Sequence, residues 1–365
     1  MIVKEFRQIG RDRRTLAMMI VMPIVLLVIL GYAASFNVSK IEVAAAGPDA
    51  ALVARELPRP FDVVTVAPSQ GRNWAVNQLR DGDAAVAVVT SGAGAAPAIL
   101  IDGTQLFAAQ ATLSALAKLG HAAPGPASAA PRPTILFNPG LDTSDIMIPG
   151  LAGVVLVFIG TVITSLGVVR ERQSGTLEQL AVMPLRPRDV YLGKIVPYFA
   201  VAAVDLAIVL AVGIAIFGVP FRGSPVVFGL GALLFLFVTL GIGVLISSVS
   251  QTQGQAIQLA VMTLLPQILL SGLIFPLASI AAGVRWIAYL LPLTYFNEIS
   301  RGIMLRAEPI GALWQPLVIL GLLSAGVVAL ATLRFRALLS PAAGRRRHHG
   351  SAPRPVVAAS AGEGA

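Results

Sequence analysis

The sequence predicts a mainly α-helical, polytopic membrane protein with six transmembrane helices and an α/β extracytoplasmic domain between the first and the second. Three observations support this fold class. Hydrophobic residues make up 56% of the 365-residue chain and charged residues only 12%, against roughly 25% charged residues in soluble domains. Long segments of the chain contain no charged residue, so the low content of charged residues is not spread evenly along the sequence. Basic residues, finally, are concentrated in a few of the segments that separate those stretches.

The uncharged stretches have the length of membrane-spanning helices, which need about 20 apolar residues. Single crossings are predicted at 15–39, at 146–169, between 194 and 222, and at 314–333. The stretch 223–283 contains no charge over 61 residues and therefore accommodates two crossings, which turn at the polar segment 247–255. The first stretch could also be a signal peptide, but its 25 uncharged residues favour an uncleaved anchor.

The distribution of basic residues predicts the orientation, because Lys and Arg beside membrane helices stay on the cytoplasmic side. The segments 1–14, 170–194 and 334–365 would share one side, and they hold 5, 5 and 6 basic residues. The segment 40–145 holds 7 basic and 9 acidic residues. We therefore expect both termini in the cytoplasm of a bacterial plasma membrane and residues 40–145 outside. The net charge of +9 is then a topology signal, which argues against nucleic-acid binding.

The segment 40–145 is long enough for a small α/β domain. Apolar runs of strand length lie at 61–66, 84–89 and 98–101, and helical patterns at 73–80 and 106–119. Residues 120–133, rich in Ala, Pro and Gly, are expected to form a flexible connection to the second crossing.

Composition excludes several kinds of chemistry. The chain has no Cys, and two of its three His lie in the tail, so disulfide, thiolate and zinc sites are not expected. No Gly-x-Ser-x-Gly motif is present. Only Lys194 follows a Gly, and Arg188 occupies the position of the first Walker A glycine, so no phosphate-binding loop exists. We expect no cofactor on this chain and no enzyme activity of its own.

The cytoplasmic loop 170–194 carries the most informative pattern. Thr176 and Gln179 have capping-box spacing, so a short helix should begin there with Leu177 and Leu180 on one apolar face. Pro184 and Pro187 should end it before the next crossing begins near Val190. Such a helix could enter a groove of a soluble partner, or it could lie against its own membrane helices.

Two other segments flank the membrane. Residues 1–14 form an amphipathic pattern that predicts a cytoplasmic interfacial helix, an anchor for the first crossing or a second contact with a partner. The basic tail 334–365 is expected to be disordered, and it serves as a topology anchor or touches anionic lipid.

Polar residues within the crossings are candidates for a substrate pathway, because their burial is costly. Asp205 lies about ten residues into the third crossing; it could line a route or be a paired structural residue. Gln251, Gln255 and Gln258 share one helical face at the start of the fifth crossing, where a solvated helix end is the simpler reading.

Several of these segments together resemble the membrane subunits of ABC-2 type exporters, the branch with a large domain after the first crossing. The segments are 4–14, 170–180 with Pro184 and Gly193-Lys194, 271–276, and 291–303. The resemblance implies a cytoplasmic ATPase partner that carries ATP and Mg, and a second permease subunit, identical or related. It also implies short helices between 275 and 301 that dip back into the membrane, which requires Arg285 at the outer interface.

The coupling helix would lie at 175–183, and the residues that we expect to couple ATPase to membrane are Arg172, Gly175, Thr176, Leu177, Glu178, Leu180 and Pro184. Membrane lipid and a periplasmic adaptor are further expected partners. The alternative function is a membrane-anchored receptor or envelope assembly factor that acts through its outer domain without transport. An intramembrane enzyme is a more remote alternative, because no paired catalytic groups are found.

Overall fold

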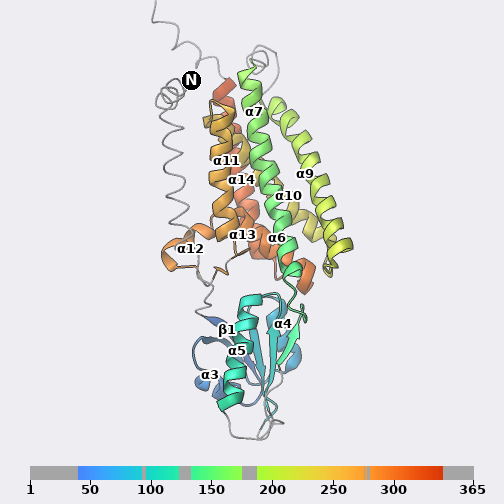
Figure 1. Ribbon diagram of the computed structural model, residues 1–365, viewed down its shortest axis with the longest axis vertical. Helices are drawn as coiled ribbons and strands as arrows, with labels where there is room; N and C mark the ends of the chain where they lie inside the picture. Colours follow the sequence, from blue (N-terminus) through green and yellow to red (C-terminus); the bar gives the residue numbers. More distant parts are fainter. Residues whose placement is uncertain are drawn as a thin grey trace, which may run out of the picture.

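The computed structural model describes residues 40–92, 96–122, 133–174, 187–274, 276–277 and 280–339. These residues form an α/β unit, 41–136, and a helical bundle, 143–339, stacked end to end (Figure 1). We call the end of the bundle beside the α/β unit the domain-side end. The opposite end, where α7 (Thr164–Gln173) finishes and α9 (Pro187–Phe217) begins, is the loop-side end.

The α/β unit contains a five-stranded sheet with the order β2-β1-β3-β4-β5. Its strands are β1 (Ile41–Ala46), β2 (Phe61–Ala67), β3 (Val86–Val89), β4 (Ala98–Asp102) and β5 (Pro133–Leu136). Neighbouring strands are parallel except β3 and β4, where Val86 lies opposite Ile101 and Val89 opposite Ala98. The central strands β1 and β3 are almost continuously apolar, as expected for strands buried on both faces.

Helices cover both faces of this sheet. Alternate residues such as Ile41, Val43 and Ile101 pack with α3 (Ala50–Glu56) and α5 (Leu106–Ala122). The intervening residues, such as Ala44 and Leu100, pack with α4 (Arg72–Arg80). The strand and helix patterns found in the sequence therefore form elements of the predicted kinds. The bounds of the expected connection 120–133 were wrong: residues 120–122 belong to α5, and Pro133 begins β5, which pairs with β4. Residues 123–132 lie outside the described residues.

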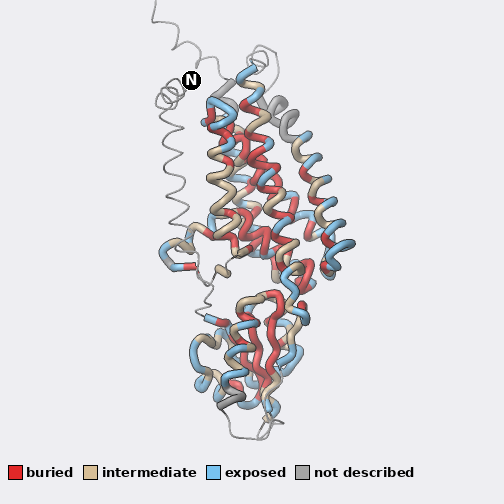
Figure 2. Tube along the Cα trace, viewed as in Figure 1, coloured by how far each residue is buried: buried red, intermediate tan, exposed pale blue. Residues whose placement is uncertain are grey.

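The bundle is built around α10 (Pro225–Val249), which packs against α14 (Trp314–Leu339) and against one long broken helix. This helix consists of α6 (Thr143–Phe158), the π-helical turn η2 (Ile159–Ile163) and α7. Beside it stands α11 (Gln253–Leu270), while α9 lies at the edge. Figure 2 shows buried residues through the centre of the bundle and largely exposed or half-buried ones along α9.

Among the described residues, four helices are long and apolar enough to cross a membrane: Thr143–Gln173, Val196–Phe217, Pro225–Val249 and Trp314–Arg334. They correspond to the predicted second, third, fourth and sixth crossings. The predicted fifth corresponds to α11, which has 18 residues and a length of about 27 Å. The predicted interfacial helix 1–14 and first crossing 15–39 lie outside the described residues. The disordered tail was predicted to begin at 334, but residues 334–339 continue α14, and only residues 340–365 lie outside the described residues. The apolar helices make this chain a multi-pass membrane protein.

Two short helices lie where the resemblance implied them. They are α12 (Ala282–Ala288) and α13 (Pro292–Arg301), and α13 continues into a π-helical turn, η4 (Gly302–Arg306). The helix α13 packs among α6, α10 and α14, and Phe296 stacks on Phe235 with 4.5 Å between ring centroids. Arg285 lies on α12 at the domain-side end, where its Nε and Nη2 donate to the carbonyl oxygen of Ile280.

The start of α9 corrects a smaller prediction. Pro187 was expected to lie before the third crossing, which would begin near Val190, but α9 begins at Pro187. Proline suits the first turn of a helix, because the N–H groups there have no partner within the helix.

The backbones of α10 and η2 approach each other closely. A Cβ atom added to Gly243 would overlap the carbonyl oxygen of Gly160, whereas one added to Gly229, on the same helix, would meet nothing within 4 Å. Close approach of backbones through small residues is a general way of packing membrane helices.

We predict that Gly243→Ala lowers the free energy of unfolding by about 1–3 kcal/mol, because the added methyl group overpacks the α10–η2 contact. The matched control Gly229→Ala should leave stability unchanged or slightly raised. Thermal unfolding of the purified protein in detergent compares the two. Equal unfolding temperatures for both variants would contradict the tight α10–η2 contact.

Candidate functional site

The predicted coupling and pathway residues fall into three groups. Gly175, Thr176, Leu177, Glu178, Leu180 and Pro184 lie outside the described residues. Arg172 lies in the last turn of α7 at the loop-side end; Gln251 lies in the turn between α10 and α11, and Gln255 and Gln258 lie in the first turns of α11. Asp205 lies apart from them within α9. The structure therefore places Arg172 at the same end of the bundle as the three glutamines, a proximity that no local sequence pattern predicts.

Arg172 ties the end of α7 to the end of α10. Its Nη1 donates a hydrogen bond of 2.9 Å to the carbonyl oxygen of Ser250, a residue 78 positions away. Ser250 follows the last residue of α10 and donates from its own backbone N–H to Ile246. A cation at the C-terminus of a helix satisfies free carbonyl groups and is favoured by the helix dipole. Among the described residues, Nη2 of Arg172 is buried without an acceptor.

The glutamines mainly organise the start of α11. Thr252 caps this helix by accepting from the backbone N–H of Gln255, and Gln255 Oε1 accepts from the N–H of Gln251 at 2.9 Å. This arrangement is close to a capping box, and the Thr252–Gln255 spacing in the sequence would have revealed it. Gln255 therefore has a structural role at this position. Gln253, which the sequence analysis did not select, donates to Gln173 Oε1 at 3.0 Å and makes a second link between α11 and α7.

Two of the pathway candidates, Gln258 and Asp205, have no hydrogen-bond partner within the described part of the chain. Gln258 is half-buried on α11, and its Oε1 has no partner among the described residues. Asp205 is half-buried on α9, between the exposed side chains of Val204 and Ile208. No ion pair or hydrogen bond joins Asp205 to another residue of the described ranges. The structure does not bring Asp205 and Gln258 into one site.

The helix that leads to Arg172 is interrupted by a π-helical turn. The turn η2 separates α6 from α7 and packs against α10. Thr161 donates to the carbonyl oxygen of Val157 at 2.6 Å, and the buried hydroxyl of Thr164 has no partner among described residues. Single π-helical turns within α-helices occur frequently at functional sites. The small and polar residues 160, 161, 164 and 165 within an apolar run were the available sequence signal.

The domain-side half of the bundle contains a cluster of hydrogen-bonded polar side chains that joins α13 to α11. Asn297 of α13 donates to Ser271 Oγ at 3.0 Å, just after α11 ends, and Arg301 Nη2 donates to the carbonyl oxygen of Gly272 at 2.6 Å. Gln267 of α11 is fully buried beside them. These bonds fix α13 to the end of α11.

Comparison with known proteins gives the family context for this arrangement. Residues 13–333 match the family described as ABC-2 family transporter protein. The chain is 34% identical over 200 residues to the probable multidrug ABC transporter permease YbhR of Escherichia coli K12, covering 55% of this chain and 54% of YbhR. It is 35% identical over 173 residues to the probable multidrug ABC transporter permease YbhS of the same organism, covering 47% and 46%.

A third relative is the inner membrane transport permease YhhJ of Escherichia coli K12, 32% identical over 204 residues, covering 55% of this chain and 54% of YhhJ. The chain thus matches about half the length of each of these relatives. The match to the family, in contrast, extends from residue 13 to residue 333 and includes every described helix of the bundle except the last residues of α14. It confirms the resemblance found in the sequence, and the chain belongs to the ABC-2 family of transporter proteins.

Proposed function

We propose that this chain is the permease subunit of an ATP-driven exporter, which moves its substrate outward with ATP hydrolysed on a separate cytoplasmic subunit. Family membership supports this function, and the Arg172 link supports its mechanism. In this proposal the loop-side end faces the cytoplasm of a bacterial plasma membrane, with both termini, and the α/β unit lies outside. The crossing at 15–39 completes six spans. ATP and Mg bind to the partner, because no Walker A motif exists here.

Force from the ATPase enters through the loop after α7. The segment 175–183 acts as the coupling helix, and Gly175, Thr176, Leu177, Glu178, Leu180 and Pro184 form or flank its contact with the ATPase. A displacement of this loop moves the end of α7. Hydrogen bonds from Arg172 to Ser250 and between Gln173 and Gln253 transmit the displacement to α10 and α11. The loop-side ends of α7, α10 and α11 consequently move as a group.

The turn η2 provides the hinge for this movement. A π-helical turn already departs from the regular α-helical hydrogen-bond pattern, so bending there disturbs fewer α-helical bonds than bending elsewhere. Because η2 touches α10 through Gly160 and Gly243, the hinge lies at a close backbone contact between two helices. Movement of α7 about η2 would open a route between this subunit and a second permease subunit. Asp205 and Gln258 remain candidates for contacts along that route.

The names of the relatives suggest a class of substrate, and the position of the α/β unit suggests a further partner. YbhR and YbhS are named as probable multidrug permeases, so drug-like compounds are the first class of substrate to test. A periplasmic adaptor is a further proposed partner, because the α/β unit would lie outside the membrane.

The link between α7 and α10 gives the test of this function. Arg172→Gln removes a charged hydrogen bond to the end of α10, an interaction worth about 1.5–3 kcal/mol. We expect ATP-driven efflux of ethidium from vesicles that contain the permease and its ATPase to fall about ten-fold. ATP hydrolysis should persist, because the ATPase itself is unchanged. The matched control is Arg170→Gln, which removes an exposed arginine from the same helix.

Equal efflux in the Arg172→Gln and Arg170→Gln variants would refute the proposed path of force. If the wild-type chain co-purifies with no ATPase and neither it nor the variants export ethidium, the exporter function as a whole is refuted and the receptor alternative is favoured.

A further inference from the structure

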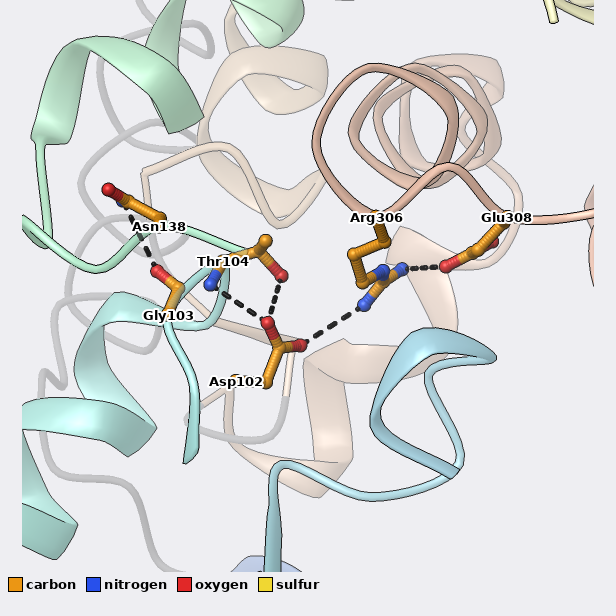
Figure 3. A network of polar contacts seen from close by, with 6 residues as sticks. All are labelled: Asp102, Gly103, Thr104, Asn138, Arg306 and Glu308. Atoms are coloured by element: carbon orange, nitrogen blue, oxygen red, sulfur yellow. Dashed lines mark hydrogen bonds and ion pairs between the residues drawn. The ribbon is translucent and has the colours of Figure 1, made fainter. Parts of the chain in front are cut away.

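A buried charge cluster joins the α/β unit to the bundle (Figure 3). Asp102 ends β4 and is fully buried, Arg306 ends η4, and Glu308 follows two residues later. Arg306 Nη1 lies 3.3 Å from Asp102 Oδ2, and Arg306 Nη2 lies 2.5 Å from Glu308 Oε1. Asp102 and Arg306 are 204 positions apart in the sequence. One guanidinium group therefore connects a strand of the α/β unit with the segment that leads into α14.

Both parts of the molecule hold this cluster in place. Asp102 Oδ1 accepts from the backbone N–H of Thr104 at 2.9 Å and from its hydroxyl at 2.7 Å, which fixes the carboxylate at the end of β4. On the bundle side, the backbone N–H of Glu308 donates to the carbonyl oxygen of Gly302 at 3.0 Å. A Cβ atom at Gly302 would overlap the Glu308 carboxylate, so the glycine makes room for it.

The contact extends to two more segments. Gly82, which precedes β3, has a φ of +78°, and a Cβ atom there would lie 3.5 Å from Arg306 Nη2. Arg222, between α9 and α10, donates from Nη1 to the carbonyl oxygens of Phe137 at 3.0 Å and Leu305 at 3.2 Å. Phe137 follows β5, and Leu305 belongs to η4. Two arginines thus tie η4 to the α/β unit.

The burial of this cluster distinguishes it from an ordinary surface ion pair. The side chains of Arg306 and Asp102 are 10% and 0% exposed, whereas those of Lys40 and Asp62, in the same α/β unit, are 71% and 51% exposed. Exposed pairs contribute little to stability. Removing one partner of a buried pair is strongly unfavourable, because the other charge stays buried without compensation. The Arg306 cluster therefore resists partial separation of the two parts.

We propose that Arg306 is a positioning residue that latches the α/β unit to the segment α13–η4, so that both move as one body when the domain-side end of the permease opens. The latch itself is inferred from the geometry of the Arg306 cluster. Only its consequence for opening rests on the proposed exporter function. Because α13 packs among α6, α10 and α14, movement of the latched body would change the domain-side end of the route. Binding of an extracytoplasmic partner to the α/β unit would reach the membrane helices through the same arginine.

The latch should also respond to pH through Glu308. Burial raises the pKa of Glu308 to about 7 from its usual 4.5; Arg306 opposes this rise, while Glu298 and Asp102 add to it. The protonated carboxyl is therefore favoured in the folded protein. Its stabilising contribution is complete below the unfolded pKa and is lost as the pH rises through the folded value.

We predict that the unfolding temperature of the wild type, measured relative to Glu308→Gln, falls as the pH rises from 5 to 8. Taking the difference removes the contribution of every other titrating group common to both proteins. A difference that stays constant over this pH range would contradict the raised pKa.

The latch itself is tested by a distance measurement, for which the absence of Cys from the chain is an advantage. Spin labels are attached to Leu52→Cys on α3 and Ile310→Cys after η4, two positions that are 58% and 57% exposed. Pulsed electron resonance on the complex with its ATPase should give one narrow distance distribution, unchanged between the nucleotide-free and the vanadate-trapped states. Arg306→Gln should broaden the distribution, and the matched control Asp62→Asn, which breaks the exposed pair, should not.

A distribution that Arg306→Gln leaves narrow, or that Asp62→Asn broadens equally, would overturn the latch. Ethidium efflux provides the second readout, which we expect to fall about ten-fold in Arg306→Gln and to be unchanged in Asp62→Asn. If Arg306→Gln does not fold, Arg306→Lys, which keeps the charge, replaces it and should broaden the distribution less. Absence of efflux in the wild type would refute the exporter function alone, because the distance result does not depend on transport.

Discussion

The hydrocarbon interior of a membrane offers no hydrogen-bond partners, and this constraint organises the whole bundle. Backbone groups must be paired within helices, so the contacts that specify how one helix is fixed to another are concentrated near the ends. Arg172 at the loop-side end ties α7 to α10, and Arg306 at the domain-side end ties η4 to the α/β unit. Between them the helices meet through apolar surfaces and through one close backbone approach at Gly160 and Gly243. The bundle is therefore fixed by charge at both ends and by shape in the middle.

This division suits a protein that transmits movement. A charged hydrogen bond to a helix end resists separation of the two helices that it joins. An apolar contact without hydrogen bonds allows the two helices to rotate and slide against each other. The turn η2 lies between the two ends of the bundle and contacts α10. In the proposed mechanism the helix bends there, so a displacement at the loop-side end reaches the domain-side end as a tilt of α6 and α7. The buried ring stack of Phe235 and Phe296 carries the contact onward from α10 to α13. Each end of the bundle thus has a rigid attachment, and the flexible part lies between them.

The sequence predicted the helices well, because apolar length and charge boundaries are local properties. It predicted β2, β3, β4, α4 and α5 for the same reason. It did not name β1 and α3, it missed β5, which is short and follows a Pro- and Gly-rich segment, and it misplaced the start of α9. The contacts of the site were beyond its reach: Arg172 and Ser250 are 78 positions apart and Asp102 and Arg306 are 204 apart, and neither pair has a local pattern. The cap formed by Thr252 and Gln255 was within reach, because its spacing is local.

The central claim is that the loop after α7 meets a cytoplasmic motor while the α/β unit faces the other side of the membrane. Thiol labelling of intact cells measures this most directly, since any Cys introduced into this chain is its only thiol. The account predicts that a membrane-impermeant maleimide labels Leu52→Cys from outside and Leu177→Cys only after permeabilisation. Labelling of Leu177→Cys from outside would contradict it, because the loop could then not reach the ATP of the cell interior.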